Sequence, residues 1–427
     1  MIDGFRAMIA PNGRIYRGWW LVLTSANVQL LGSLLWMQSY GAYLVLLNDE
    51  FGWSPIVFSW AFALTRLESG ILGPLQGWLV DRYGPRLILS IGMVLFGLGF
   101  MLFSQIETVL GFFTALALIA VGSSLGGFAT LMVSLVNWFQ RYRSTAVAVS
   151  QMGYSLGGIG LPVIVWLLEV WGWRTTAFVS GWVVLIVGIP LVQRIHHRPG
   201  DVGDVVDGAL SSTTDSTAAA ASDVSFTARQ ALATRAFWLI SFGHAIALLA
   251  VAALLVHLIT HLTITLKYSL TEASLVVSLV TGFQIVGQLS GGYLGDRFSK
   301  RWLCTACMLL HGAALLVLAQ ASTTPEVWLF AVLHGLAWGT RGPQMIALRA
   351  DYFGASAFGT ILGFSSLIVM FGTMSGPLIV AYLTEATGTT AAGLQVLAAI
   401  CLVGAACFAA ARKPTLPGEQ ALLKGSS

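Results

Sequence analysis

Residues 77–86 have the sequence GWLVDRYGPR, and residues 292–301, which begin 215 positions later, have the related sequence GYLGDRFSKR. Each segment lies between two long apolar runs. Two further pairs of motifs recur at nearly the same offset, namely NWF at 137–139 with DYF at 351–353, and LP at 161–162 with GP at 376–377. Three matches at one spacing predict that the chain is a duplication of two similar halves.

The composition indicates that the chain folds in lipid. Of its 427 residues, 56% are hydrophobic and only 9% are charged, against roughly 25% charged residues in soluble domains. A span needs roughly 20 mainly apolar residues, and the long, non-alternating runs favour helices over barrel strands. Twelve such runs are predicted, at 18–47, 55–80, 87–106, 109–138, 144–169, 174–194, 236–266, 271–295, 302–321, 326–350, 355–386 and 390–411.

The cationic residues orient these spans. Eighteen of the 22 Lys and Arg residues fall in segments on one side, Arg349 being counted among them. Only Arg174 and Lys267 fall on the other side. The positive-inside rule therefore predicts a multi-pass protein of the cell membrane with both termini in the cytoplasm. The cations form short clusters and no continuous basic face, so no nucleic-acid partner is expected, and the first run is too long for a cleaved signal peptide.

A polar stretch at 196–224 divides six spans from six and is expected to be flexible. A short amphipathic helix, capped by Ser225 or Thr227, is expected to follow it on the inner membrane surface. The predicted organisation is a cytoplasmic tail at 1–16, a six-helix bundle at 17–194, a linker at 195–235, a second six-helix bundle at 236–411 and a tail at 412–427.

GWLVDRYGPR resembles the signature G-x-L-x-D-R-x-G-x-R of the major facilitator superfamily, and GYLGDRFSKR resembles it except for Ser299. The resemblance implies a secondary transporter with twelve transmembrane helices in two pseudo-symmetric six-helix bundles, an all-α polytopic fold. It also implies a latch between the halves that releases on switching. The alternative is that these residues only anchor the loops by charge. The predicted gating residues are Gly77, Asp81, Arg82, Gly84, Arg86, Asp296, Arg297 and Arg301.

Further motifs resemble the branch that holds monocarboxylate transporters and oxalate/formate antiporters. They are YRGWW at 16–20, FGWS at 51–54, the long motif at 137–158 and DYFGASAFGTILG at 351–363. The branch implies small organic anions, moved with a proton or by exchange. One departure matters, because Gln284 and Gln288 stand where animal members carry an Asp and an Arg, so the branch's binding residues do not carry over.

Charged side chains inside predicted spans are expensive in lipid and so are functional candidates. Arg66 and Glu68 in the second span are two residues apart and point to opposite sides of the helix. Arg66 shares its face with glycines and is a candidate for binding substrate. Glu68 needs a partner in its own half or must be protonated. It either carries a coupled proton or forms a structural pair with another helix.

The tenth span carries the stronger polar stripe. Arg341 lies near its middle, with His334 two turns earlier and Trp338 and Gln344 flanking it. The superfamily resemblance implies that the first, fourth, seventh and tenth helices line a central cavity. Arg341 would bind a carboxylate through paired hydrogen bonds, Trp338 would pack its apolar part, and His334 would relay a proton. The alternative is that Arg341 caps carbonyls freed where nearby Gly and Pro residues break the helix.

Other polar residues are weaker candidates. On the first span Gln29, Trp36 and Tyr40 share one face, which we expect to line the cavity. Gln284 and Gln288 either hydrogen-bond the substrate or join helices. His257 and His261, one turn apart, could hold a metal but lack an evident third ligand, so a wet cavity lining is expected and no metal or cofactor is predicted. The four cysteines are expected to be structural thiols.

No GxxxxGK[ST] loop is present, so ATP-driven transport is not expected. Ser124 and Ser155 have no His/Asp arrangement that would make either a nucleophile, so no enzyme is predicted. The predicted function is alternating-access transport of a small, monocarboxylate-like organic anion across the lipid membrane, with a proton or by exchange. The alternatives are an efflux pump for larger amphipathic compounds and a non-transporting membrane sensor.

Overall fold

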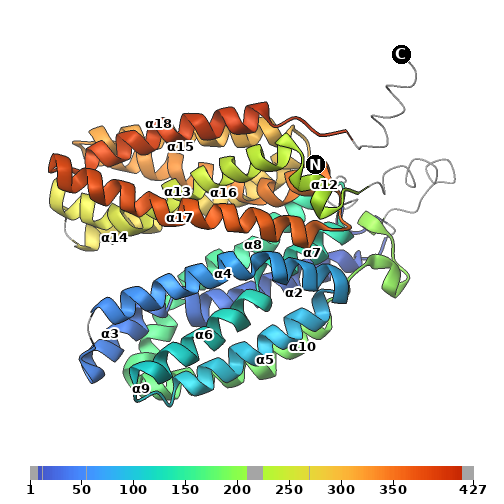
Figure 1. Ribbon diagram of the computed structural model, residues 1–427, viewed down its shortest axis with the longest axis horizontal. Coiled ribbons are helices and arrows are strands. Elements are labelled where there is room, and N and C mark those ends of the chain that lie inside the picture. Colours follow the sequence, from blue (N-terminus) through green and yellow to red (C-terminus); the bar gives the residue numbers. More distant parts are fainter. Residues whose placement is uncertain (1–7, 12, 54, 209–224, 269, 416–427) are drawn as a thin grey trace. The chain divides into compact units, whose positions relative to one another are not determined.

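The computed structural model describes residues 8–11, 13–53, 55–208, 225–268 and 270–415 (Figure 1). Every regular element among these residues is helical. The chain divides into two compact units, Met1–Leu210 (unit 1) and Ser211–Ser427 (unit 2).

Unit 1 begins its first span with α2 (Arg17–Gly32), which continues through a π-helical turn into α3 (Tyr40–Phe51). The chain then turns at Gly52, where φ is 60°. The remaining helices of unit 1 are α4 (Pro55–Tyr83), α5 (Pro85–Phe103), α6 (Val109–Leu125), α7 (Phe128–Trp138), α8 (Arg143–Ile159), α9 (Leu161–Val183) and α10 (Ile189–Gln193).

Unit 2 opens with the short helix α12 (Ala228–Leu232), the helix expected after the linker. Its N-cap is Thr227, whose side chain accepts a hydrogen bond from the Gln230 amide in a capping box. The long helices that follow are α13 (Arg235–Thr260), α14 (Leu270–Gly295), α15 (Lys300–Gln320), α16 (Thr324–Phe353), α17 (Phe358–Thr387) and α18 (Thr390–Ala410).

These helices account for the twelve predicted spans. α6 and α7 together form the fourth span, and α9 turns at Gly172 (φ 75°), so that its two parts belong to the fifth and sixth spans. Nine helical stretches in the described residues are long and apolar enough to cross a membrane. The other three spans are α4, α8 with the start of α9, and α16. The fold is therefore the predicted all-α polytopic arrangement.

The helices pair in the same way in both units, as duplication predicts. In unit 1, α2 packs on α8, α4 on α6 and α5 on α9. In unit 2, α13 packs on α17, α14 on α16 and α15 on α18. Each unit thus buries its own core.

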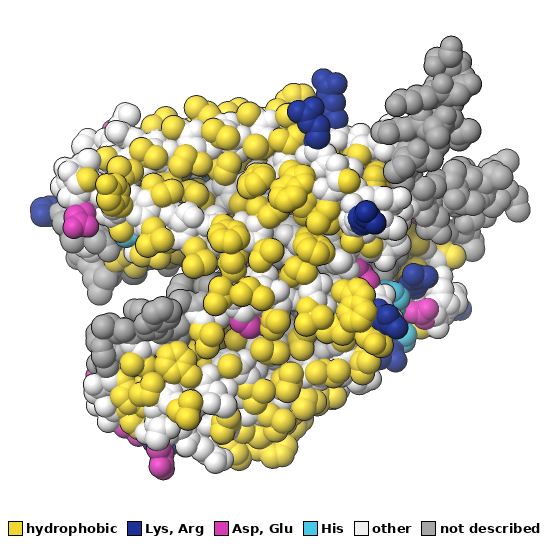
Figure 2. Space-filling view, in the orientation of Figure 1, with side chains coloured by type: hydrophobic (Ala, Val, Ile, Leu, Met, Phe, Trp, Pro, Cys, Tyr) yellow, Lys and Arg dark blue, Asp and Glu magenta, His cyan; other side chains and the backbone are white. Residues whose placement is uncertain are grey.

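Large apolar side chains also cover the outside of the helices. Leu110, Leu255 and Tyr382 are each more than 70% exposed, and Figure 2 shows hydrophobic side chains over most of the face that it draws. Contiguous exposed apolar surface of this extent is unfavourable in water. It fits a protein whose helices face lipid, and the chain is a multi-pass membrane protein.

The two signature loops differ in backbone conformation. Gly84 precedes α5 with φ at 83°, a left-handed conformation that costs a glycine little, and Pro85 then begins the helix. Ser299, at the matching position before α15, has φ at −62°. Because the second loop needs no positive φ, serine stands there without strain.

The first part of the linker is ordered against unit 1, contrary to the expected flexibility of 196–224. Trp138 Nε1 donates to the His196 carbonyl at 3.0 Å, and Asp207 accepts backbone amides before α8, including that of Arg141 at 2.8 Å. Burial, with nearby Asp204 and Asp207, raises the pKa of Tyr16, so its hydroxyl stays protonated and donates to the Trp138 carbonyl. Residues 209–224 lie outside the described part of the chain.

Candidate functional site

Arg341 lies inside α16 and is 1% exposed. Its guanidinium makes no hydrogen bond or ion pair with any other residue in the described part of the chain, and its Nε atom is fully buried. The guanidinium therefore does not cap carbonyls near Pro343, although that was one alternative for it. A buried charge without a partner is energetically costly.

The groups around Arg341 do not include a carboxylate among the described residues. The ionisable groups within its electrostatic reach include the thiols of Cys304, Cys307 and Cys401, the imidazoles of His244, His311 and His334, and Arg349. The three thiols come from α15 and α18, and all three are buried and free of disulfides. The expectation of structural thiols fits this placement.

His334 lies two turns before Arg341 on α16 and contacts a second imidazole that the sequence analysis missed. His311, on α15, is fully buried, and its Nδ1 atom is 3.1 Å from Nδ1 of His334. The two rings are 4.7 Å apart at 63°. Phe330 stacks on one side of His334, and the half-buried Trp338 lies 6.2 Å away. His334, Trp338 and Arg341 thus all belong to one helix, α16.

A second arginine, Arg349, is also buried in α16 at 1% exposure. It was counted with the cytoplasmic cations as an anchoring charge, but its side chain is buried in the core of unit 2. Its Nη1 donates to the Met345 carbonyl at 2.7 Å, and its Nη2 donates to Ser365 Oγ at 2.7 Å and to His244 Nδ1 at 3.1 Å. Since a guanidinium only donates, His244 accepts through Nδ1 and carries its own proton on Nε2.

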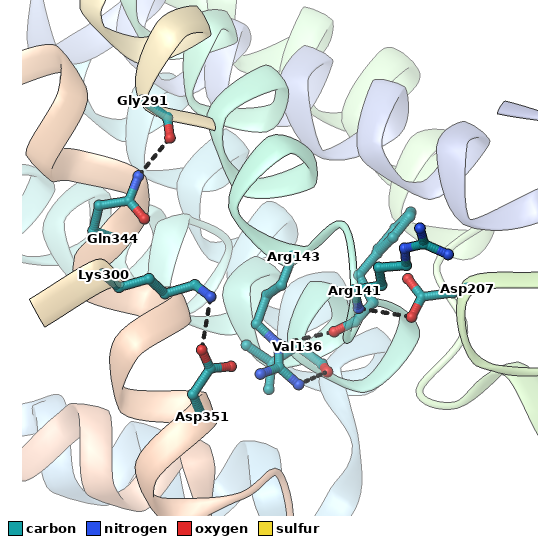
Figure 3. A network of polar contacts seen from close by, with 9 residues as sticks. Val136, Arg141, Arg143, Asp207, Gly291, Lys300, Gln344 and Asp351 are labelled. Atoms are coloured by element: carbon teal, nitrogen blue, oxygen red, sulfur yellow. Dashed lines mark hydrogen bonds and ion pairs between the residues drawn. The ribbon is translucent and has the colours of Figure 1, made fainter. Parts of the chain in front are cut away.

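The predicted glutamines lie where α14 and α16 pack together. Gln344 Nε2 donates to the Gly291 carbonyl at 2.7 Å, as Figure 3 shows. Gln284 and Gln288 are both buried on α14. A side chain at Gly339 would come within 2.0 Å of the Gln284 carbonyl oxygen, so the two backbones are in close contact. Gln344 therefore joins the two helices.

In unit 1, Gln29 Nε2 donates to Ser150 Oγ at 2.7 Å and so joins α2 to α8. Trp36 is 3% exposed and packs against aromatic rings of α5 and against Tyr40, 5.2 Å away. Glu68 is half-buried in α4. Arg66 also lies in α4, but its side chain is outside the described part of the structure.

The signature arginines lie over aromatic rings or bind backbone. Arg82 lies 5.3 Å from the Trp78 ring, Arg297 lies 3.6 Å from the Tyr293 ring and Arg301 lies 4.8 Å from the Trp302 ring. Arg86 instead binds backbone, since its Nε donates to the Ile195 carbonyl at 2.9 Å. Of the remaining gating candidates, Gly77 is buried and Asp81 and Asp296 are half-buried.

An ion pair joins α15 and α16 in unit 2. Lys300 Nζ at the start of α15 lies 2.8 Å from Asp351 Oδ2 near the end of α16 (Figure 3). The pair lies beside the second signature copy and ties the two helices together.

The seventh-span histidines are linkers between helices. His257 Nε2 is 3.0 Å from the Pro377 carbonyl, and His261 contacts Thr390 and the Leu318 carbonyl. No group of three or more possible metal ligands occurs among the residues that the structure describes.

Comparison with known proteins places this chain among transporters. The family model of the Major Facilitator Superfamily matches residues 28–269 and 240–426. "Monocarboxylate transporter 13" of Rattus norvegicus is 26% identical over 91% of this chain and 87% of its own length. "Benzoate transport protein" of Acinetobacter baylyi is 21% identical over 85% of this chain and 83% of its own length. "Fujikurins efflux protein" of Gibberella fujikuroi is 25% identical over 42% of this chain and 39% of its own length.

Two solved structures have the same fold. The human organic anion transporter MFSD10 (TETRAN) aligns with a TM-score of 0.73 at 14% identity, covering 92% of this chain and all of that one. The proton:xylose symporter XylE, bound to 6-bromo-6-deoxy-D-glucose, aligns with a TM-score of 0.72 at 15% identity, covering 95% of this chain and 98% of that one.

Proposed function

We propose that this chain, which belongs to the Major Facilitator Superfamily, moves a small organic anion across the membrane by alternating access. It is a transporter and not an enzyme. The proposed substrate is monocarboxylate-like and moves with a proton or in exchange for another anion. Both termini would be cytoplasmic, as the distribution of cations indicates.

One observation carries the anion specificity. In the described part of the chain, the buried charged side chains are Arg143, Arg341 and Arg349; no Asp or Glu residue is buried as a whole, although Oε1 of the half-buried Glu68 is shielded from solvent. Arg143 and Arg349 each donate to backbone carbonyls, and Arg349 also donates to Ser365 and His244 although its Nε has no partner among the described residues, whereas Arg341 makes no hydrogen bond or ion pair with any of them. A substrate carboxylate would accept two parallel hydrogen bonds from Arg341 and neutralise it.

The neighbours of Arg341 suit a small acid. Trp338 offers an apolar surface for the carbon skeleton, and His334 is a proton acceptor on the same helix. The relatives support this reading, because a rat monocarboxylate transporter and a bacterial benzoate transport protein each align along most of this chain. The two signature loops would latch and release the cytoplasmic side during the transport cycle.

A second candidate function is efflux of a larger amphipathic compound. It is favoured by the match to a fungal efflux protein, although that match covers 42% of this chain. Such a substrate would not require the charge on Arg341. The two proposals therefore differ in what a neutral residue at position 341 would do.

Uptake into liposomes tests the proposal. Purified protein is tested with labelled lactate, pyruvate, oxalate and formate under an imposed pH gradient, and protein-free liposomes are subtracted because protonated weak acids cross lipid unaided. We expect uptake of at least one anion, reduced about a hundredfold by Arg341→Gln and partly kept by Arg341→Lys. Arg194→Gln is the matched control, because Arg194 is exposed at the end of α10. Uptake that Arg341→Gln leaves intact would contradict the proposed site.

A further inference from the structure

The His311–His334 pair has a defined proton capacity. Its Nδ1–Nδ1 distance of 3.1 Å requires one N–H donor and one bare nitrogen. In the neutral pair, one ring therefore carries its proton on Nδ1 and has a bare Nε2. The other ring has a bare Nδ1 and carries its proton on Nε2. His311 Nε2 is buried and has no hydrogen-bond partner among the described residues, so no protein donor or acceptor is committed to that nitrogen.

The pair can take up one proton and no more without breaking. A proton added to the bare Nε2 makes an imidazolium that still donates its Nδ1–H to the neighbouring ring. A second proton would place a hydrogen on both Nδ1 atoms and two like charges on adjacent rings. Both rings are buried, at 0% and 2% exposure, so the second proton would find no solvent to stabilise it.

The surroundings of the pair are positive or neutral. Arg341 lies two turns from His334 on α16; the ionisable groups within electrostatic reach of Arg341 include the Cys304, Cys307 and Cys401 thiols and the buried imidazole of His244. Farther along the same helix, Arg349 adds a second positive charge. A proton on the pair and the guanidinium of Arg341 are like charges about two helical turns apart along α16, so they repel each other. A bound anion would cancel that effect.

We propose that His311 and His334 together hold the single proton that moves with each anion, and that the anion at Arg341 permits its uptake. The proposal rests on the anion site proposed above and adds a second residue and a stoichiometry to it. The proton comes from water on the side where the site is open, adds to the bare Nε2, and returns to water from a ring Nε2 on the other side. No bond of the anion is made or broken, and a monocarboxylate and its proton cross without net charge.

Proton-driven accumulation and anion exchange, measured on the same liposomes, test this proposal. The probe is labelled lactate, or pyruvate or formate if the wild type exchanges it faster, and protein-free liposomes are subtracted. With the outside one pH unit below the inside, one proton per anion predicts about tenfold accumulation by the wild type. Both His311→Gln and His334→Gln should lose this accumulation and keep exchange of external for internal anion at equal pH. The double variant should resemble either single one, because the pair acts as a unit.

His257→Gln is the matched control, since His257 binds the Pro377 carbonyl outside the pair, and it should accumulate anion like the wild type. Accumulation of about tenfold by both single variants would overturn the proposal. So would loss of exchange together with accumulation in both, since that would indicate a purely structural pair. Absence of exchange of all three anions by the wild type would instead overturn the proposed function on which the pair's role rests.

Discussion

The two units have the same arrangement of helices but differ in the residues at equivalent positions. At four positions unit 1 has apolar or small residues where unit 2, 214 or 215 residues later, has buried titratable or charged ones. The corresponding residues are Phe96 and His311, Ala120 and His334, Gly127 and Arg341, and Leu135 and Arg349. The helix also differs, because unit 1 breaks its fourth span between α6 and α7 whereas α16 runs unbroken past Arg341. Duplication kept the scaffold, and this buried chemistry is present in only one copy.

A pair of matched serines makes the comparison sharper. Ser150 on α8 and Ser365 on α17 are equivalent, and each accepts a hydrogen bond of 2.7 Å. In unit 1 the donor is Gln29, a neutral amide, whereas in unit 2 it is Arg349. His244, the equivalent of Gln29, also accepts from Arg349. The same acceptor therefore anchors a neutral bridge in one unit and a buried cation in the other.

The largest effect should come from giving unit 1 the cation of unit 2. Leu135 is fully buried, and Gln29 already donates to the serine that would have to accept from a new arginine. Leu135→Arg should therefore destabilise the protein by about 3–5 kcal/mol, seen as a large fall in Tm in detergent. Leu135→Met, the volume-conserving control, should cost less than about 1.5 kcal/mol. A stable Leu135→Arg protein would show that both units can hold a buried cation.

The next largest effect is a difference in stability between variants of the two serines. Ser365→Ala removes a hydrogen bond from the charged Arg349 and a second from Ser241 Oγ at 2.9 Å, and should cost about 2–3 kcal/mol in thermal unfolding; Ser241→Ala, which removes only the neutral bond, is the control that isolates the charge. Ser150→Ala should cost about 1 kcal/mol, because the lost bond is neutral and Gln29 keeps its bond to the Ser150 carbonyl at 2.9 Å. Equal losses in Ser365→Ala and Ser150→Ala would mean that the charge of Arg349 contributes nothing to the bridge.

The smallest effect concerns the signature loops. Gly84→Ala forces a side chain into a backbone with φ at 83° and should cost about 1–2 kcal/mol. Ser299→Ala, at φ −62°, should stay within about 0.5 kcal/mol of the wild type in the same thermal assay. If Gly84→Ala were equally silent, the glycine of the first copy would have no backbone role.

Most of the fold was predicted from the sequence. The apolar runs predicted the spans, the repeat at about 215 residues predicted two similar units, and the resemblance of the signature implied the two six-helix bundles. The short helix expected after Ser225 or Thr227 is present, with Thr227 as its N-cap. The ordering of residues 195–208 was missed, because it depends on carbonyls that accept bonds from distant side chains such as Arg86 and Trp138.

The core of unit 2 was predicted only in part. Helical periodicity placed His334, Trp338 and Arg341 on one stripe, but it cannot tell which neighbouring helix that stripe contacts, so His311 was missed. The burial of Arg349 was not predicted, because its position near a span end resembles that of an anchoring cation. The repeat offset was the signal that could have found it, since its counterpart, Leu135, is an apolar core residue.

The central claim is that the unpaired guanidinium of Arg341 binds the substrate carboxylate. Direct binding of labelled lactate, pyruvate or formate to purified protein in detergent tests it without any transport step. The account predicts saturable binding by the wild type, weakened about 30-fold or more by Arg341→Gln and about tenfold by Arg341→Lys, which keeps the charge but loses the paired geometry. Binding by Arg341→Gln within about twofold of the wild type would contradict it.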